Sequence, residues 1–133
     1  MDPWFAETHA ALARAYDVLG TFELLPSNES FSRAREEADK ALQLDDTLSE
    51  AYAARGFASS MHEHDWNAAE QDFQRALTLN PNDATAHHWY AEHLINIGQA
   101  DHAVTELERA RELDPLSLPI NGTLGRAYGL TRH

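Results

Sequence analysis

The chain of 133 residues contains no cysteine, which excludes disulfide bonds and cysteine-based metal sites. It also has no apolar run long enough for a transmembrane helix. The first residues, Met1 to Trp4, lack the basic and apolar regions of a signal peptide. These absences do not determine the cellular compartment. The cytoplasm is favoured, and the periplasm is the alternative if a parent protein has a transmembrane helix outside this chain.

Basic residues are scarce, since 10 Lys and Arg stand against 22 Asp and Glu for a formal net charge of −12. Nonspecific nucleic-acid binding requires clustered Lys and Arg against the phosphates, so we expect none from this segment. The simpler interpretation of the charge is a solvated acidic surface, and the alternative is a preference for a basic partner.

Glycine and proline are also few, 6 and 5, and they lie between windows of helical periodicity. No run alternates between apolar and polar residues as a half-buried strand does. The sequence predicts seven helices, at residues 3–19, 29–44, 48–61, 66–79, 83–97, 100–113 and about 117–130. Expected helix-end residues are Asp2, a Thr47–Glu50 capping box, Asp65, and Gly98 in the left-handed C-terminal position.

One short motif occurs three times: an alanine, a leucine three residues later, and then a polar residue at which the helix ends. It begins at Ala41, Ala76 and Ala110, so the copies lie 35 and 34 residues apart. A period near 34 is typical of repeats built from helix hairpins, in which each hairpin leaves apolar surface that only a neighbour covers. Ala76 and Ala110 should lie where helices approach closely, so a large side chain there should overpack the stack.

The third period, 82–115, fits the tetratricopeptide repeat (TPR) pattern without a gap, through Tyr90, Ala91, Leu94, Gly98, Ala103, Leu107, Ala110 and Pro115. His87 takes the position of the usual tryptophan, and we expect its ring to pack against the preceding helix. The periods 2–46 and 47–81 also match. The first carries an insertion of about nine residues near 20–30, and the second has one extra turn residue between His62 and Asp65.

The chain thus resembles the TPR family over nearly its whole length. The resemblance implies an all-α, right-handed α-solenoid of antiparallel helix hairpins, with about 3.5 repeats in a single domain 1–133. The segment 116–133 resembles the first helix of a fourth repeat, which indicates an excised piece; the alternative is a true end cap. A narrower resemblance is to the TPR regions of large bacterial signalling and transcriptional regulator proteins, although no DNA-binding, kinase or cyclase domain is present.

Eight histidines raise the question of a metal site, with candidate ligands at His62 and His64 and at His87 and His88. A helix of about 14 residues is about 21 Å long, so the two histidine pairs should lie far apart and no metal is expected. No phosphate loop, nucleophile elbow or zinc-protease motif occurs. We therefore expect no enzyme, catalytic residue or cofactor, and keep an enzyme or metal protein as a minor alternative. Trp66 is expected to pack on the neighbouring repeat.

In the TPR family the first helices of the hairpins line a concave groove. By resemblance, the partner-groove positions are Glu7, Arg14, Asp17, Glu50, Phe57, Met61, His88, Glu92, Ile95, Asn96 and Arg126. Ala10, Ala53 and Glu92 replace the Lys and Asn residues with which some TPR co-chaperones clamp a peptide carboxylate, so that mode is disfavoured.

The resemblance therefore implies a protein–protein interaction scaffold. Its partner would be a protein or peptide segment with apolar anchors and some basic residues. The alternative is self-association through the exposed repeat ends, which would give a homodimer.

Overall fold

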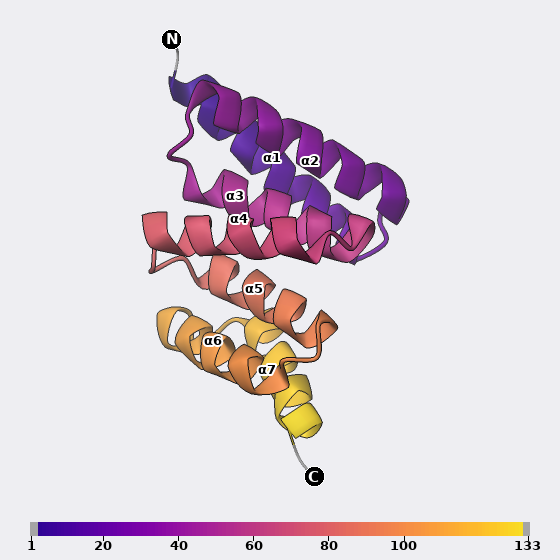
Figure 1. The fold of residues 1–133 in the computed structure, drawn as a ribbon, viewed down its shortest axis with the longest axis vertical. Helices are drawn as coiled ribbons and strands as arrows, with labels where there is room; N and C mark the ends of the chain where they lie inside the picture. The colour runs from indigo at the N-terminus through magenta and orange to yellow at the C-terminus, as the bar shows by residue number, and fades with distance from the viewer. Residues whose placement is uncertain (1–2, 132–133) are drawn as a thin grey trace.

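The computed structural model describes residues 3–131, which form an elongated stack of helices with the two ends of the chain at opposite ends of the stack (Figure 1). The helices are α1 (Pro3–Thr21), α2 (Ser27–Leu44), α3 (Ser49–Ala58), α4 (Trp66–Leu79), α5 (Ala84–Asn96), α6 (Ala100–Leu113) and α7 (Leu118–Thr131). The predicted all-α solenoid of seven helices is confirmed, and no strand occurs among these residues.

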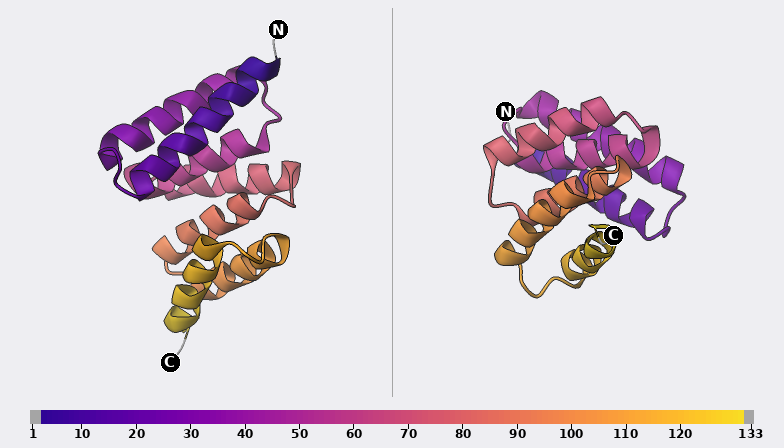
Figure 2. Two further views of the ribbon diagram at one scale, coloured as in Figure 1. Left: turned by 180° about the vertical axis from the view of Figure 1, so that it is seen from behind. Right: turned by 60° about the horizontal axis from the view of Figure 1, so that its bottom comes forward.

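The helices form two layers. α1–α2, α3–α4 and α5–α6 are hairpins, and α7 packs on α6 and α5. The first helices α1, α3, α5 and α7 line one side of the stack, whereas α2, α4 and α6 line the other (Figures 1 and 2). None of the helices in this part of the chain combines the length and the apolarity needed to cross a membrane.

The hairpins pack through alanines. Ala13, Ala34, Ala76, Ala91 and Ala110 are completely buried, which allows neighbouring backbones to approach closely. Large side chains fill the space that remains between these contacts, and the fully buried ones include Phe73, Leu94 and Leu107. A single core cluster extends in this way from α1 to α7, so every hairpin is held by its neighbours.

The insertion in the first repeat lengthens its helices more than its loop. The loop predicted at 20–28 is present but shorter, at 22–26, because α1 continues to Thr21 and α2 already begins at Ser27. As a result α1 has 19 residues, whereas α5 has 13. α1 ends where Glu23 turns left-handed, with φ 56°, and the Leu24 N–H donates to the Leu19 carbonyl at 2.9 Å. Gly20 lies inside the helix, where a Cβ would lie 3.0 Å from the Ser30 Cβ, so the close approach of α1 and α2 favours glycine at this position.

The extra residue of the second repeat lies within a helix. α3 ends at Ala58 and continues as a π-helical turn over Ser59–Glu63, where the sequence predicts an ordinary helix to 61 followed by a longer turn. His64 then adopts a left-handed φ of 53°, and the Asp65 N–H donates to the Ser59 carbonyl. A π-turn accommodates one additional residue without breaking the backbone hydrogen bonding.

Two of the predicted helix ends are confirmed and one is wrong. Asp65 accepts a hydrogen bond from the Ala68 N–H at 3.2 Å, and Gly98 has φ 80°. The Thr47–Glu50 capping box does not form, because the Asp45 carboxylate accepts from both the Thr47 N–H (2.9 Å) and hydroxyl (2.6 Å). Asp2, the fourth expected helix-end residue, lies outside the described residues.

Enlarging a buried alanine should destabilise the stack. We expect Ala76→Leu and Ala110→Leu each to lower the free energy of unfolding by about 1–3 kcal/mol, because each site has no free volume. Urea denaturation followed by circular dichroism measures this change. Ala15→Leu, on the exposed face of α1, is the control and should be nearly neutral. Equal stability of all three variants and the wild type would show that the alanines do not set the helix spacing.

Candidate functional site

The side of the stack formed by α1, α3, α5 and α7 (Figure 2) contains two adjoining cavities, which together are called the groove below. The larger, of about 600 Å³, is the α1–α7 cavity, because its walls are α1 and the start of α7 and its floor is α5. The smaller, of about 370 Å³, is the α2–α3 cavity. Thr21, His88, Trp89 and Glu92 line both, so the two form one continuous recess.

Six of the eleven predicted groove residues line these cavities. They are Arg14, Phe57, Met61, His88, Glu92 and Arg126. Glu7, Glu50, Ile95 and Asn96 lie outside both cavities, but two of them support cavity residues. The Glu50 carboxylate binds Arg14, and the Asn96 amide contacts the Met61 sulfur at 3.6 Å.

The prediction that Asp17 is a groove residue is wrong, because its side chain is completely buried and cannot face a partner. Neither of its carboxyl oxygens has a hydrogen-bond partner among the described residues. Burial without compensating partners raises the pKa of Asp17 well above its ordinary value. The repeat alignment assigns the same role to this position in every hairpin and carries no information about this burial.

Trp89 forms the floor of the groove, and the sequence prediction missed it. Its ring stacks on Phe57 with centroids 4.6 Å apart, and the Arg14 guanidinium lies over it at 5.9 Å. Phe57 is only 3% exposed, so it supports Trp89 more than it offers surface to a partner. A signal was available: Trp89 precedes Glu92, a predicted groove residue, by three residues and therefore lies on the same face of α5.

Arg14 is held by two polar contacts that join three helices. Its Nη1 donates to the Glu50 carboxylate on α3 at 2.9 Å, and its Nη2 donates to the Thr85 hydroxyl on α5 at 3.0 Å. The positive charge of Arg14 is thus already matched by a carboxylate within the groove. A ligand anion would have to compete with Glu50 for this guanidinium.

Glu92 joins α5 to α7 in a similar way. Its carboxylate accepts from the Thr123 hydroxyl at 3.0 Å and from Arg126 at 2.6 Å, and the same hydroxyl lies 2.9 Å from the His88 Nε2. Burial alone would raise the pKa of Glu92, but contacts with His88, Arg126 and Thr123 outweigh it and lower this pKa. Glu92 is therefore an ionised carboxylate with its charge matched.

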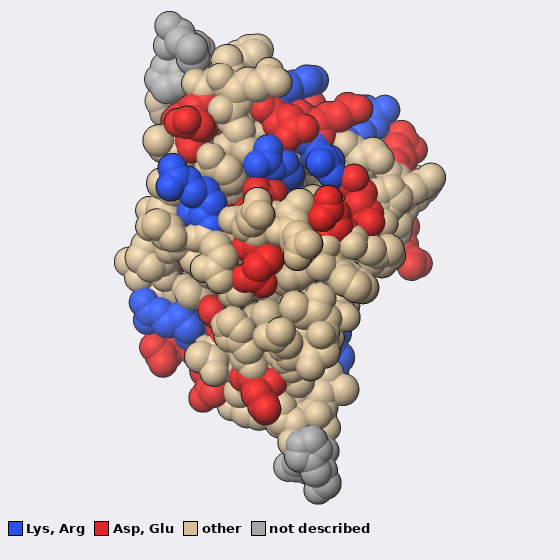
Figure 3. Space-filling view, viewed as in Figure 1, with Lys and Arg blue, Asp and Glu red and all other residues tan. Residues whose placement is uncertain are grey.

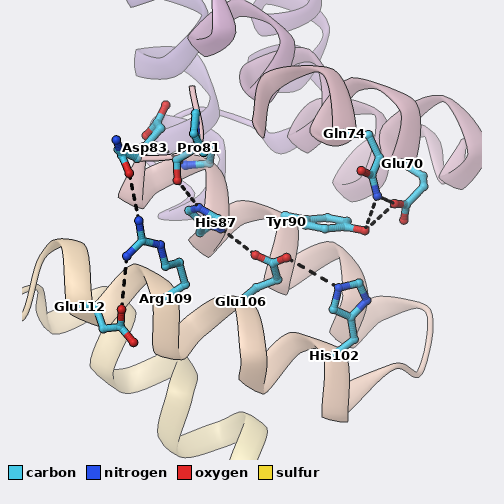
Figure 4. Close-up of polar contacts among 12 residues, drawn as sticks. Glu70, Gln74, Pro81, Asp83, His87, Tyr90, His102, Glu106, Arg109 and Glu112 are labelled. Atoms are coloured by element: carbon cyan, nitrogen blue, oxygen red, sulfur yellow. Dashed lines mark hydrogen bonds and ion pairs between the residues drawn. The ribbon is translucent and has the colours of Figure 1, made fainter. Parts of the chain in front are cut away.

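A second set of titratable side chains lies between α5 and α6, away from the groove (Figure 4). The His87 Nδ1 is 2.6 Å from the Glu106 carboxylate and its Nε2 is 2.8 Å from the Pro81 carbonyl, so both ring nitrogens face acceptors, which favours the protonated ring. Burial lowers the pKa of His87, but these two acceptors outweigh it and raise the pKa overall. His87 thus packs on the following helix, not on the preceding helix as predicted.

His93, almost two turns further along α5, behaves in the opposite way. It is completely buried, with its Nδ1 2.9 Å from the Ser60 hydroxyl and its ring against Phe73 and Tyr90. Burial lowers its pKa, and Glu70, with an oxygen 3.6 Å from Nε2, only partly offsets this. That separation exceeds hydrogen-bond length, so burial, which favours the neutral ring, outweighs the neighbouring carboxylate.

The remaining histidine candidates have packing roles. His62 stacks on Phe31 at 6.3 Å, and His64 meets Trp66 edge to face at 6.0 Å. Trp66 is 44% exposed and contacts this histidine, whereas the sequence predicted that it packs on the neighbouring repeat. Across residues 3–131 no three His, Asp or Glu side chains are placed to hold a metal ion.

The outer helices carry most of the charged pairs. Over α2 and α4, positive and negative side chains lie next to one another (Figure 3). Arg55, for example, binds both Asp39 at 3.0 Å and Asp72 at 2.9 Å, and Arg35 pairs with Glu63. This face therefore presents mixed charge and no single-sign patch to a partner.

The groove on the first helices and the alanine-packed hairpins define a helical repeat protein. A profile described as tetratricopeptide repeat matches residues 60–128, just over half of the chain. The chain therefore belongs to the TPR family.

Among curated proteins, the chain is 25% identical over 115 residues to the transcriptional regulator HilA of Salmonella typhimurium, and equally so to HilA of Salmonella typhi. The match covers 86% of this chain but only 21% of HilA, so the chain spans about a fifth of the length of these relatives.

Solved TPR structures superpose closely on the chain. TTC0263 from Thermus thermophilus has a TM-score of 0.73 at 19% identity, covering 95% of this chain and 65% of that one. MamA has a TM-score of 0.69 at 28% identity, with coverage of 96% and 69%. The first TPR of Spaghetti (RPAP3), bound to an HSP90 peptide, has a TM-score of 0.68 at 18% identity, with coverage of 90% and 93%.

The burial of Asp17 predicts a pH-dependent stability cost. Because its pKa is raised in the folded state, the free energy of unfolding should fall as the pH rises from about 4 towards that raised pKa. Asp17→Asn should remove this fall, because an amide at this position does not ionise. Urea denaturation at acidic and neutral pH measures both effects. Asp114→Asn, the same substitution at an exposed site, is the control.

The two buried histidines of α5 should titrate on opposite sides of the ordinary pKa of about 6.5. We expect an imidazole NMR titration to place His87 above this value and His93 below it. Glu106→Gln should lower the His87 midpoint, because it removes the carboxylate that holds the imidazolium. A His87 midpoint that does not move in this variant would contradict the assigned contact.

Proposed function

We propose that this chain is a protein-interaction scaffold that holds a segment of a partner protein in the groove of its first helices. The observation that carries the proposal is the continuous recess floored by Trp89 and walled by α1 and α7. Binding alone is the proposed activity, with no covalent step. The partner-bound TPR structures of similar fold support this, since Spaghetti holds an HSP90 peptide and the second TPR domain of human RPAP3 an HSP70 peptide.

The charges of the groove indicate which kind of segment is not bound. Both cationic side chains lining it, Arg14 and Arg126, are already paired with Glu50 and Glu92. Capture of a C-terminal carboxylate would leave one of these glutamates without its partner, at a cost in desolvation. We therefore propose recognition of an internal segment through apolar side chains, not of a chain end.

We further propose that the chain is part of a larger bacterial regulatory protein, in which it presents this groove to a regulator or effector. The match to HilA over most of this chain, but about a fifth of HilA, supports such an arrangement. The TPR fold generally serves interaction and not catalysis, which supports a non-enzymatic role.

Groove substitutions should reduce partner retention. Met61→Glu and Arg126→Glu change one wall of the α2–α3 cavity without touching a fully buried side chain, so both variants should fold. In a quantitative pull-down from the source cells, the double variant should lose proteins that the wild type retains. Arg75→Glu, exposed on α4, is the control for altered charge. Identical captured sets for all three chains would reject the groove as the binding site.

Self-association is the second candidate, because both end helices of the stack expose large apolar side chains. Leu12 on α1 is 41% exposed, and Tyr128 and Leu130 on α7 are 40% and 52% exposed. Sedimentation equilibrium over a range of concentrations would reveal a dimer, and the double variant Leu12→Glu with Leu130→Glu should dissociate it. A wild-type chain that remains monomeric at the highest concentration would reject this candidate.

A further inference from the structure

The α1–α7 cavity exists because α1 is longer than the other first helices. Thr21 and Phe22 belong to the insertion of the first repeat, and together with Val18 they form one wall of the cavity. In the third repeat the corresponding helix ends at Asn96, after about three and a half helical turns. This recess is thus a property of this chain and not of a regular repeat.

Exposed apolar side chains gather at the mouth of this cavity. Val18 is 43% exposed, Phe22 65% and Leu118 84%, and all three line it. Leu24, in the loop after α1, and Leu116, in the turn before α7, are exposed by 69% and 90%. Three large exposed apolar residues of the described chain therefore line one recess, which is unusual for a solvated surface and typical of a binding site.

The floor of the cavity offers no unmatched charge. Arg14 is bound by Glu50 and Thr85, and Glu92 is bound by Thr123 and Arg126. A charged group entering the cavity would lose its hydration without gaining a free counter-charge. The interior therefore favours an apolar side chain, which would contact the exposed apolar residues Val18, Phe22 and Leu118 above the largely buried Trp89.

The rim, in contrast, has unpaired negative charge. Asp114 lines the α1–α7 cavity and Glu23 lines the adjoining α2–α3 cavity, and no ion pair reaches either carboxylate within residues 3–131. Both basic residues of the groove are neutralised, so a cation passing the rim meets an excess of negative charge.

We propose that the α1–α7 cavity binds an internal peptide segment in which a bulky apolar side chain is closely followed or preceded by Lys or Arg. The apolar side chain enters between Val18, Phe22 and Leu118, above Trp89, and the cation faces Asp114 or Glu23 on the rim. This inference rests on the proposed function and specifies the chemistry of the partner. The apolar anchor supplies the affinity, and the cation supplies orientation and a salt-dependent association rate.

Selection from a phage-displayed library of random peptides of about 12 residues tests the proposal on the whole chain. Enriched sequences should combine an aromatic or large aliphatic residue with a neighbouring Lys or Arg. The same peptides are then synthesised with a fluorescent label, and their dissociation constants are measured by anisotropy. Enrichment of acidic sequences, or of sequences bearing only a free carboxyl terminus as the common feature, would overturn the proposal.

Matched variants separate the cavity from the rest of the surface. Val18→Asp and Leu118→Asp should each weaken a selected peptide by roughly tenfold, because both introduce charge at the apolar mouth. Leu12→Asp is the control, since Leu12 lies on the same helix as Val18 with nearly equal exposure, 41% against 43%, but outside both cavities. Circular dichroism is used to check that all three variants retain their helices.

The rim charges have their own test. Asp114→Asn and Glu23→Gln should each weaken the peptide by roughly threefold at low salt, and the effect should fade as salt is added. Unchanged affinity and salt dependence in the double variant would overturn the cationic part of the proposal.

The remaining outcomes distinguish this inference from the proposed function. A different result would be peptides that bind the Val18→Asp and Leu118→Asp variants with unchanged affinity but no longer bind the Met61→Glu variant. That result would overturn the cavity assignment and leave the scaffold function standing. If no peptide is enriched and Val18→Asp converts a wild-type dimer to a monomer in sedimentation, a second copy covers the cavity and the proposal is wrong. If no peptide is enriched and the chain is monomeric, the peptide proposal is wrong. The scaffold function fails as well only if the pull-down captures identical sets with the wild type and the groove variant.

Discussion

The close contact of helices at alanine positions is the constraint on which the rest of this structure depends. Ala34, Ala76 and Ala110 have no exposed surface, and each lies where the backbone of one helix meets the next. This spacing brings the side chains of the first helices into register along one side of the stack. The groove is therefore a consequence of the packing: its floor and walls come from α1, α5 and α7, which are far apart in the sequence.

Polar contacts then fix the groove across the hairpins. Arg14 joins α1 to α3 and α5, and Glu92 joins α5 to α7, so each first helix is bonded to another through its groove-facing surface. These contacts occupy the charges that a partner could otherwise bind. The recess is consequently preorganised in shape and neutral in its interior, which favours recognition of apolar groups.

The fold could be predicted from the sequence because the repeat occurs three times. Each copy specifies the same alanines and the same breaks, so helix order and hairpin pairing follow from the alignment alone. The departures could not be predicted in this way. The insertion has no counterpart in the other repeats, so the alignment does not predict its conformation. Its residues extend α1 and α2, and α1 ends only just before Glu23, whose backbone is left-handed.

The site was only partly predictable, for a related reason. Alignment assigns a position to the groove, but the burial of Asp17 and the placement of Trp89 depend on side-chain size in neighbouring helices. His87 likewise occupies the aligned tryptophan position, yet its two ring nitrogens bind acceptors on the turn before it and on α6. Hydrogen-bonding capacity, which a size-based pattern ignores, decided where this ring lies.

The opposite pKa shifts of His87 and His93 have a consequence for how the fold responds to acidity. Acidification towards about pH 6.5 stabilises the fold through His87, which binds its proton more tightly in the folded chain than in the unfolded chain. Further acidification below about pH 6.5 destabilises the fold through His93, which binds its proton less tightly in the folded chain. The combined contribution of these two buried imidazoles of α5, the floor of the groove, is therefore greatest close to the pKa of a free histidine side chain.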